Sequence, residues 1–164
     1  MKMTLFFIGQ LLIFSNQSVF GSESSLCKPS EKMIASCHLH EGKNRVVSLC
    51  ASADSTLVFY RIGKEQSMEL VNDFSKRRVL SRWVDKATYT TYFGFRLPPY
   101  SYVFGVPQQT YGAKAFLEAY KDDKEIMLRV CTENSFGETA LRSEAIREVP
   151  DDVVRGNDFL FPPY

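Results

Sequence analysis

The chain has 164 residues, and its 20 lysines and arginines nearly balance its 19 aspartates and glutamates. A formal net charge of +1 gives no reason to expect nucleic acid or an anionic membrane as a partner. The length suits one domain with a substantial core.

Residues 1–21 have the layout of a signal peptide. Lys2 supplies a positive charge, and residues 5–14 form an apolar stretch that is too short to span a bilayer. Val19 and Gly21 occupy the positions at which a cleavage site needs small residues. We therefore expect cleavage after Gly21, with a buried amino-terminal helix as the alternative.

Residues 22–164 are expected to form a single disulfide-containing, β-rich domain. Leu26 precedes the first cysteine, at the position where a bacterial lipobox needs a small residue, so no lipid anchor is expected. No other apolar run in the sequence is long enough to span a membrane. The mature protein is therefore expected to be soluble, periplasmic or secreted, and without a membrane anchor.

Export predicts disulfide bonds rather than metal ligation for the four cysteines, Cys27, Cys37, Cys50 and Cys131. No CxxC motif is present, and the spacing fits no zinc module. Four cysteines allow three pairings.

The first expected hairpin spans residues 33–52 and sets His40 opposite Arg45. In that register the Cys37 and Cys50 side chains are diagonal neighbours roughly 7–8 Å apart, which is long for a disulfide. A Cys37–Cys50 bond is therefore disfavoured. Both remaining pairings tie the last cysteine to this hairpin.

Residues 56–62 and 67–71 are typical of a second hairpin around a turn at 63–66. The next segment, 72–87, has apolar residues at helical spacing and is interpreted equally as a short amphipathic helix or a long ordered loop. Its basic residues would form either a solvated face or an electrostatic docking patch: Lys76, Arg77, Arg78, Arg82 and Lys86.

Residues 88–106 give the strongest strand signal, because aromatic residues alternate on both sides of a Pro-Pro dipeptide. A symmetric turn pairs Leu97 with Tyr100, Phe95 with Tyr102 and Phe93 with Phe104, so that two apolar rows share one face. Proline cannot adopt the positive φ of a two-residue primed turn. The turn is therefore expected to be wider or to contain a cis proline.

Residues 113–120 and 125–131 predict another hairpin, with Tyr120 opposite Glu125 and Leu117 paired with Leu128. The competing interpretation is a helix over residues 113–120, which are good helix formers.

Ser135 and Glu138 have the spacing of a capping box and predict a short helix that ends before Pro150. The tail, residues 158–164, is too apolar for an ordinary solvated terminus. We expect it to pack on its own domain, the alternative being a peptide signal for a partner.

These elements predict a mainly β fold, a small antiparallel barrel or sandwich built from hairpins with one or two short helices. Most of the phenylalanines and tyrosines would fill it.

No catalytic or cofactor motif is present: GxSxG, HExxH, the P-loop and GxGxxG are all missing from the sequence. His38 and His40 would share a strand face, which gives a two-histidine metal site the right geometry, but two edge histidines are the simpler interpretation. Acidic residues near aromatic segments, Asp85, Glu118 and Glu133, would serve a glycosidase only as a spatial pair. No metal or cofactor is expected.

The best candidate for recognition is the end of the aromatic hairpin, a rigid, partly apolar and donor-rich segment formed by Arg96, Leu97, Pro98, Pro99 and Tyr100. Tyrosine and arginine tend to dominate interface energetics, and a proline-stiffened loop loses little entropy on docking. The alternative is that Leu97 and Tyr100 simply close the core.

Several motifs resemble a largely uncharacterised family of exported bacterial β-rich proteins. The resemblance rests on a serine-leucine-cysteine-alanine-serine run at 48–52, on the Tyr60-Arg61-Ile62-Gly63-Lys64 sequence, and on the aromatic hairpin. It implies export and a β-rich fold, and it transfers no catalytic residue.

We therefore expect a non-enzymatic, soluble periplasmic binding protein whose partner is another protein. An inhibitor or immunity protein directed at an envelope- or cell-wall-acting enzyme is the most concrete version. The alternatives are a small hydrolase of envelope glycans or lipids, and a small-ligand carrier with an apolar pocket inside the barrel.

Overall fold

The computed structural model describes residues 24–164, and the signal peptide expected over residues 1–21 lies outside the described residues. The strands are β1 (Lys32–His38), β2 (Val46–Ala51), β3 (Val58–Lys64), β4 (Ser67–Phe74), β5 (Leu80–Asp85), β6 (Thr90–Leu97), β7 (Tyr100–Val106), β8 (Phe116–Lys121), β9 (Lys124–Val130) and β10 (Ile146–Glu148), followed by helix α1 (Asp151–Arg155). No helix in this part of the chain is long and apolar enough to cross a membrane.

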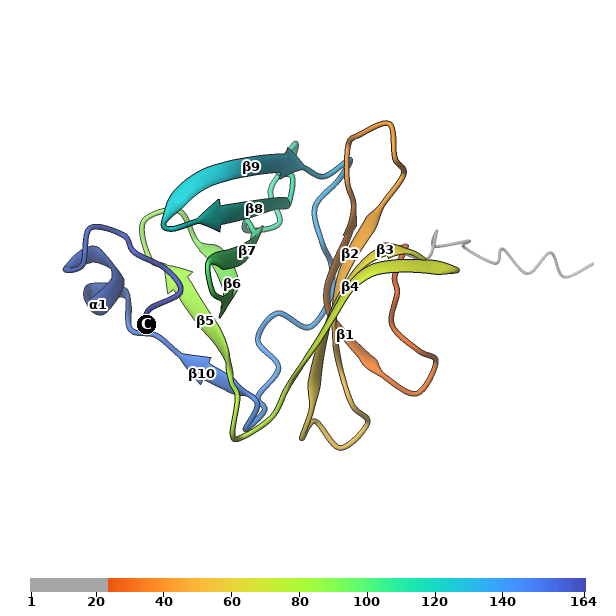
Figure 1. Ribbon diagram of the computed structural model, residues 1–164, viewed down its shortest axis with the longest axis horizontal. Helices are drawn as coiled ribbons and strands as arrows, with labels where there is room; N and C mark the ends of the chain where they lie inside the picture. Colours follow the sequence, from red (N-terminus) through yellow and green to blue (C-terminus); the bar gives the residue numbers. More distant parts are fainter. Residues whose placement is uncertain (1–23) are drawn as a thin grey trace, which may run out of the picture.

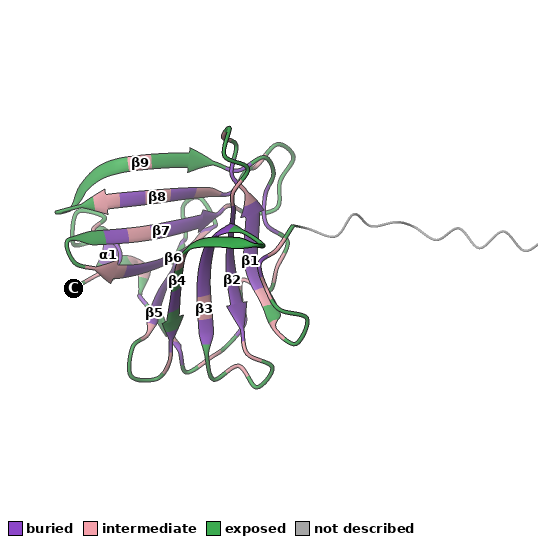
Figure 2. Cartoon of the chain, turned by 45° about the vertical axis from the view of Figure 1, so that its right-hand side comes forward, coloured by how far each residue is buried: buried purple, intermediate pink, exposed green. Residues whose placement is uncertain are grey.

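The strands form two sheets that pack as a sandwich, as predicted, and they do not close into a barrel (Figure 1). The first sheet has the order β1-β2-β3-β4, and the second has the order β10-β5-β6-β7-β8-β9. The strands of one sheet run across those of the other (Figure 2). All neighbouring strands are antiparallel except β10, which runs parallel to β5.

Aromatic rings fill the space between the sheets. Phe95 lies with its ring centroid 4.9 Å from that of Tyr60 and 5.2 Å from that of Phe74, both edge-on. Phe93 and Phe104 are also fully buried in this core. Burying each such ring stabilises the fold by roughly 2–3 kcal/mol relative to exposure.

The register predicted for the aromatic hairpin is confirmed. Leu97 faces Tyr100, Phe95 faces Tyr102 and Phe93 faces Phe104 across β6 and β7. The Pro98–Pro99 peptide bond is cis, which was one of the two expected turn forms.

The first hairpin forms where expected, but its predicted register is wrong by one residue near the turn and by two residues beyond a bulge in β1. Cys37 faces Val47, and Met33 faces Cys50 after a bulge in β1. The amide of Leu39 donates to the carbonyl of Arg45, which gives a five-residue turn instead of four. The shift sets Ser36 opposite Ser48, and their buried hydroxyls lie 2.8 Å apart in a hydrogen bond.

The disulfides are Cys27–Cys50 and Cys37–Cys131, with Cα–Cα distances of 5.4 and 5.8 Å. The disfavoured Cys37–Cys50 pairing is therefore not formed, and Cys131 is tied to the first hairpin as predicted. The second bond joins the two sheets, because Cys131 follows β9 directly and pairs with Leu39 next to the end of β1.

Neither interpretation of residues 72–87 was correct, because the segment completes β4, turns at 75–78 and forms β5. Leu80 is buried between the sheets and Trp83 on the outer face of the second sheet. A strand covered on both faces loses the alternation that identifies strands, and its apolar residues imitate helical spacing.

The basic residues of this segment do not form one patch. Arg82 is buried and donates to Glu148 and to the carbonyl oxygens of Thr139 and Leu141. The others are exposed at two separate turns: Lys76, Arg77, Arg78 and Lys86.

The hairpin of β8 and β9 is confirmed, and the competing helix is wrong. Tyr120 faces Glu125, but a bulge beyond this pair sets Leu117 opposite Arg129 instead of Leu128. The extra residue on β9 turns Leu128 away from the core, and the Leu128 residue is therefore 45% exposed to solvent.

The helix predicted after Ser135 is also wrong. The Ser135 hydroxyl accepts a hydrogen bond from the amide of Ser36 at 2.8 Å, and the amide of Glu138 donates to the carbonyl of Met33. The capping-box residues are thus used to cover the edge of β1. The short helix α1 begins just after Pro150 instead of ending before it.

We expect the two disulfides to differ in their contribution to stability. Loop-closure entropy predicts about 5 kcal/mol for the 94-residue separation of Cys37 and Cys131, against about 3 kcal/mol for the 23-residue separation of Cys27 and Cys50. Urea unfolding of the two double Cys→Ala variants measures the difference. Equal losses, or a larger loss for Cys27→Ala/Cys50→Ala, would contradict this account.

Candidate partner-binding site

The carboxy-terminal tail packs on the outer face of the second sheet, as predicted. Phe161 is buried there, with its ring centroid 5.7 Å from that of Trp83 and 6.4 Å from that of Tyr92. A Cβ atom at Gly94 would come within 2.6 Å of the Phe161 ring. Glycine at this position of β6 therefore allows the tail to lie against the sheet.

Arg96 fastens the end of the tail to the sheet instead of projecting from it. Its Nε donates to the carbonyl of Pro162 at 2.8 Å, and its Nη1 donates to Asp123 Oδ1 at 2.9 Å. Its guanidinium lies 4.0 Å from the centroid of the Tyr164 ring. With its side chain 17% exposed, Arg96 is a positioning residue beneath the predicted site.

The other predicted residues divide between core and surface. Leu97 packs against the core, whereas Pro98, Pro99 and Tyr100 are exposed. The alternative in which the hairpin end closes the core therefore applies to Leu97, while Tyr100 stays 37% exposed.

The turn between β8 and β9 lies beside the end of β6–β7. The amide of Asp122 donates to the carbonyl of Pro99 at 2.9 Å, and Lys121 lies 5.9 Å from the Tyr100 ring. Together with the tail, the two turns form what we call the tip surface: Pro98, Pro99, Tyr100, Asp122, Asp123 and Tyr164. These residues and Arg96 line a hollow of about 130 Å³.

Tyr164 and Asp123 complete the tip surface, and the sequence analysis did not identify either. The Tyr164 hydroxyl donates to Asp123, and this bond together with the bond from Arg96 lowers the pKa of the Asp123 carboxyl. The same bond raises the pKa of the Tyr164 phenol. The apolar tail was the available signal for Tyr164. The sequence of the acidic turn at 122–123 indicated only an ordinary hairpin loop.

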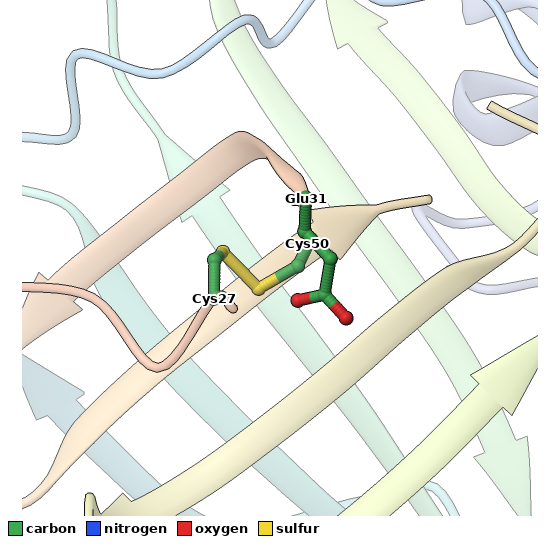
Figure 3. Close-up of side chains that lie close together, drawn as sticks. All are labelled: Cys27, Glu31 and Cys50. Carbon is green, nitrogen blue, oxygen red and sulfur yellow. A yellow bond between two sulfur atoms is a disulfide. The ribbon is translucent and has the colours of Figure 1, made fainter. Parts of the chain in front are cut away.

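A second cluster has the composition of a metal site but a different role. One ligand atom each of Cys27, Glu31 and Cys50 lie within 4.8 Å of one another (Figure 3). The two sulfurs are joined in a disulfide, however, and metals bind the thiolate. His38, at the end of β1, and His40, in the following turn, are not part of this cluster.

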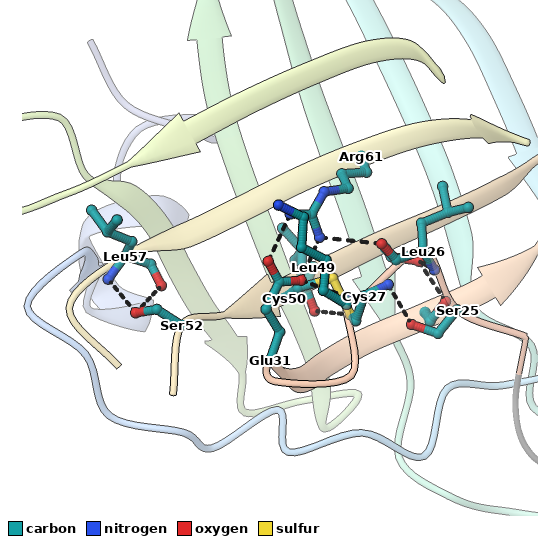
Figure 4. A network of polar contacts seen from close by, with 12 residues as sticks. Ser25, Leu26, Cys27, Glu31, Leu49, Cys50, Ser52, Leu57 and Arg61 are labelled. Carbon is teal, nitrogen blue, oxygen red and sulfur yellow. Dashed lines mark hydrogen bonds and ion pairs between the residues drawn. A yellow bond between two sulfur atoms is a disulfide. The ribbon is translucent and has the colours of Figure 1, made fainter. Parts of the chain in front are cut away.

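Glu31 is instead engaged with Arg61. The Arg61 Nη1 and Nη2 atoms lie 2.6 and 2.8 Å from the two carboxylate oxygens, and both side chains are at most 7% exposed (Figure 4). Arg61 also donates to the carbonyl of Leu26, next to the disulfide. The pair therefore anchors the amino-terminal segment to β3.

This pair predicts a pH-dependent stability. Burial tends to raise the pKa of Glu31, but hydrogen bonds from Arg61 and from the Lys28 amide outweigh it and lower the pKa. A lowered pKa stabilises the fold above the unfolded pKa of about 4.3, and that stability is lost as the pH falls through the folded pKa.

Glu31→Gln is thus expected to cost roughly 3 kcal/mol near neutral pH, because Arg61 stays buried without its counter-ion. The difference from the native protein should shrink in urea unfolding at about pH 3, because the unfolded chain takes up a proton at Glu31 below its unfolded pKa and the stability of the native protein then falls. A loss that is the same at both pH values would contradict the assignment.

The hydrolase interpretation requires two carboxylates in one cleft, at least one of them with a raised pKa. Burial raises the pKa of Glu118, which accepts a hydrogen bond from Tyr120, but Glu118 does not line the hollows described here. Asp122 and Asp123 do line the tip hollow, where the pKa of Asp123 is lowered. That is opposite to what a general acid requires.

The other acidic candidates have separate surroundings. Asp85 is buried, and burial alone would raise the pKa of its carboxyl. Hydrogen bonds from Ala87 and Thr88 and the charge of Arg155 outweigh that effect, so the pKa is lowered. Glu133 is exposed in the loop after Cys131.

The carrier interpretation requires an apolar cavity between the sheets. Fully buried aromatic side chains occupy that space, and the larger hollows, of about 350–400 Å³, are lined by residues of loops, of strand ends, of the amino-terminal segment and of the tail.

The geometry therefore defines a disulfide-bonded, two-sheet β-sandwich with a tip surface held by its own carboxy terminus. Protein-family models, curated proteins and solved structures were compared with the chain, and none matches it.

Arg96→Ala is expected to release the tail. Loss of the charge-assisted bond to Pro162 should lower the free energy of unfolding by roughly 1–3 kcal/mol, and a carboxypeptidase that cleaves after proline should remove Tyr164 from Pro163 faster than in the native protein. Arg96→Lys keeps a cation near Asp123 but loses the planar fork, so it should restore stability in part. Unchanged trimming by carboxypeptidase would contradict the role of Arg96.

Proposed function

We propose that this chain is an exported, soluble, non-enzymatic binding protein that engages another protein through its tip surface. Inhibition of, or immunity against, an envelope- or cell-wall-acting enzyme is the most specific form of the proposal. The two disulfides are compatible with an oxidising compartment. The expected signal peptide and the resemblance to exported β-rich proteins support the same location.

The observation that carries the proposal is the fixed arrangement of exposed aromatic and proline residues at the tip. Tyr100 and Tyr164 are 37% and 85% exposed. The backbone beneath them is held by the bond from Asp122 to Pro99 and by the bonds of Arg96. Tyrosines on a surface of this kind bind with little loss of conformational entropy.

Charged groups around the tyrosines would supply specificity. Lys121 and Asp122 are exposed close to the hairpin turn that carries Tyr100, and hydrogen bonds from Tyr164 and Arg96 lower the pKa of Asp123. Such groups at the rim of an interface orient a partner more than they increase affinity.

The test is affinity capture with the native chain as bait from periplasmic and competitor-cell extracts, followed by measurement of the dissociation constant with the purified captured protein. Tyr100→Ala/Tyr164→Ala should weaken binding at least about tenfold, since truncated interface tyrosines commonly cost more than 1 kcal/mol. An inhibitor would also reduce the activity of a captured hydrolase at equimolar ratio.

The matched control is Met68→Ala/Val71→Ala, which removes two exposed apolar side chains from β4. This variant should bind like the native chain. If both double variants capture the same protein with native affinity, the tip is not the binding site. If the native chain captures nothing from either extract, the proposal fails as a whole.

A further inference from the structure

Two adjoining hollows lie at the opposite end of β7 from the tip surface. The first, of about 400 Å³, is lined by residues of β6, of the loop that follows β7, and of the segment after β9. The second, of about 350 Å³, lies on the other side of the same loop. Gln109 lines both, so we call the two together the loop groove. Each volume lies in the range of roughly 300–1,000 Å³ typical of small-molecule sites.

The wall of the loop groove is held in place by the fold. Asn134 Nδ2 donates to the carbonyl of Pro107 at 2.9 Å, and the Ala113 amide donates to the carbonyl of Thr110 at 3.1 Å. Ser135 is fixed to β1 by the amide of Ser36, and it lies four residues after the disulfide-bonded Cys131. The loop is therefore braced at both ends before any ligand binds.

The first hollow has hydrogen-bonding groups but no charge. Its lining comprises Tyr89, Thr91, Val106, Pro107, Gln108, Gln109, Ser135 and Thr139. The side chains of Gln108 and Gln109 form no hydrogen bond with the described residues. Amide and hydroxyl groups that both donate and accept suit a ligand whose own groups do both.

Exposed tyrosine rings stand at both hollows. Tyr89 is 64% exposed beside the first, and Tyr111 is fully exposed beside the second. Tyr89 has a positive φ of 53°, a backbone conformation that a residue with a bulky side chain rarely adopts. The negative face of an aromatic ring attracts the polarised C–H groups of a flat, hydroxylated ring.

These features together select a class of ligand. A phosphorylated or anionic ligand would need an excess of cations; the first hollow has none, and in the second Lys114 is matched by Glu133. A purely apolar ligand would leave the amide groups unpaired. A neutral ligand rich in hydroxyl groups, with C–H faces that stack on tyrosine, satisfies both the amides and the rings.

We propose that the loop groove binds a neutral oligosaccharide, with Tyr89 and Tyr111 as stacking platforms and Gln108 and Gln109 as hydrogen-bonding groups. The site lies at the far end of β7, about 20 Å from the tip surface by the rise of that strand. It is therefore independent of the proposed protein partner, and either proposal can fail without the other.

The test is nuclear magnetic resonance titration of the ¹⁵N-labelled native chain with three neutral probes: chitotetraose, cellotetraose and maltotetraose. We expect at least one probe at millimolar concentration to shift the amide signals of residues 107–113 and 132–139 in a saturable manner. Tyr89→Ala and Gln109→Ala should each weaken that binding roughly tenfold, the effect of losing about 1.4 kcal/mol. Tyr89→Phe, which keeps the ring, should retain it.

Met68→Ala/Val71→Ala again serves as the control and should bind the probe like the native chain. Unchanged spectra outside the loops would show that each variant is folded. The proposal is overturned if no probe shifts these signals, if the shifts lie elsewhere, or if Tyr89→Ala and Gln109→Ala both bind as the native chain does. Binding of tetra-alanine at the same signals, with no effect of any saccharide, would assign the groove to peptides and also overturn it.

Discussion

The rest of the structure depends on how β6 and β7 divide their side chains between two faces. Facing inward, Phe93, Phe95 and Phe104 are buried in the core between the sheets, where Phe95 contacts the aromatic rings of Tyr60 and Phe74 of the first sheet. Facing outward, Gly94 leaves room for the ring of Phe161. A slip of one residue would place the aromatic row where the tail lies and the glycine in the core. One hairpin therefore determines both the sandwich core and the position of the carboxy terminus.

The tip surface is a consequence of this arrangement. Once Phe161 is seated, Pro162 comes within hydrogen-bonding distance of Arg96, and Tyr164 reaches Asp123 in the next hairpin turn. Residues far apart in the sequence are thus brought to one end of the sheet. The opposite end is built differently, from loops braced by Asn134 and the Cys37–Cys131 disulfide. The chain therefore presents two separate and chemically distinct surfaces.

Local patterns predicted those features that depend on the alternation of side chains along a single pair of neighbouring strands. Period-two alternation predicted the β6–β7 register, and the strand geometry expected for the first hairpin disfavoured the Cys37–Cys50 bond, which is not formed. The incorrect predictions have physical causes that cannot be recognised in the local sequence. The turn of the first hairpin is one residue longer than predicted, and bulges in β1 and β9 each shift the register of the residues beyond them by one more position. Strand β5 is covered on both faces, and Ser135 bonds to a distant strand instead of capping a helix.

The candidate site was predicted in the same partial way. Pro98, Pro99 and Tyr100 are exposed at a turn, which the sequence indicated. The contribution of Asp123 and Tyr164 depends on tertiary placement, because 41 residues separate the two side chains that bond. Tertiary placement also explains why Arg96 holds the tail and the Asp123 turn in position and is not an exposed hydrogen-bond donor.

The tip surface is expected to be ordered before any partner binds, and amide hydrogen exchange of the free protein tests this most directly. The Asp122 amide, which donates to Pro99, should exchange slowly in the free chain and change little on binding a partner. Rapid exchange of Asp122 in the free chain, with protection only in a complex, would contradict the account.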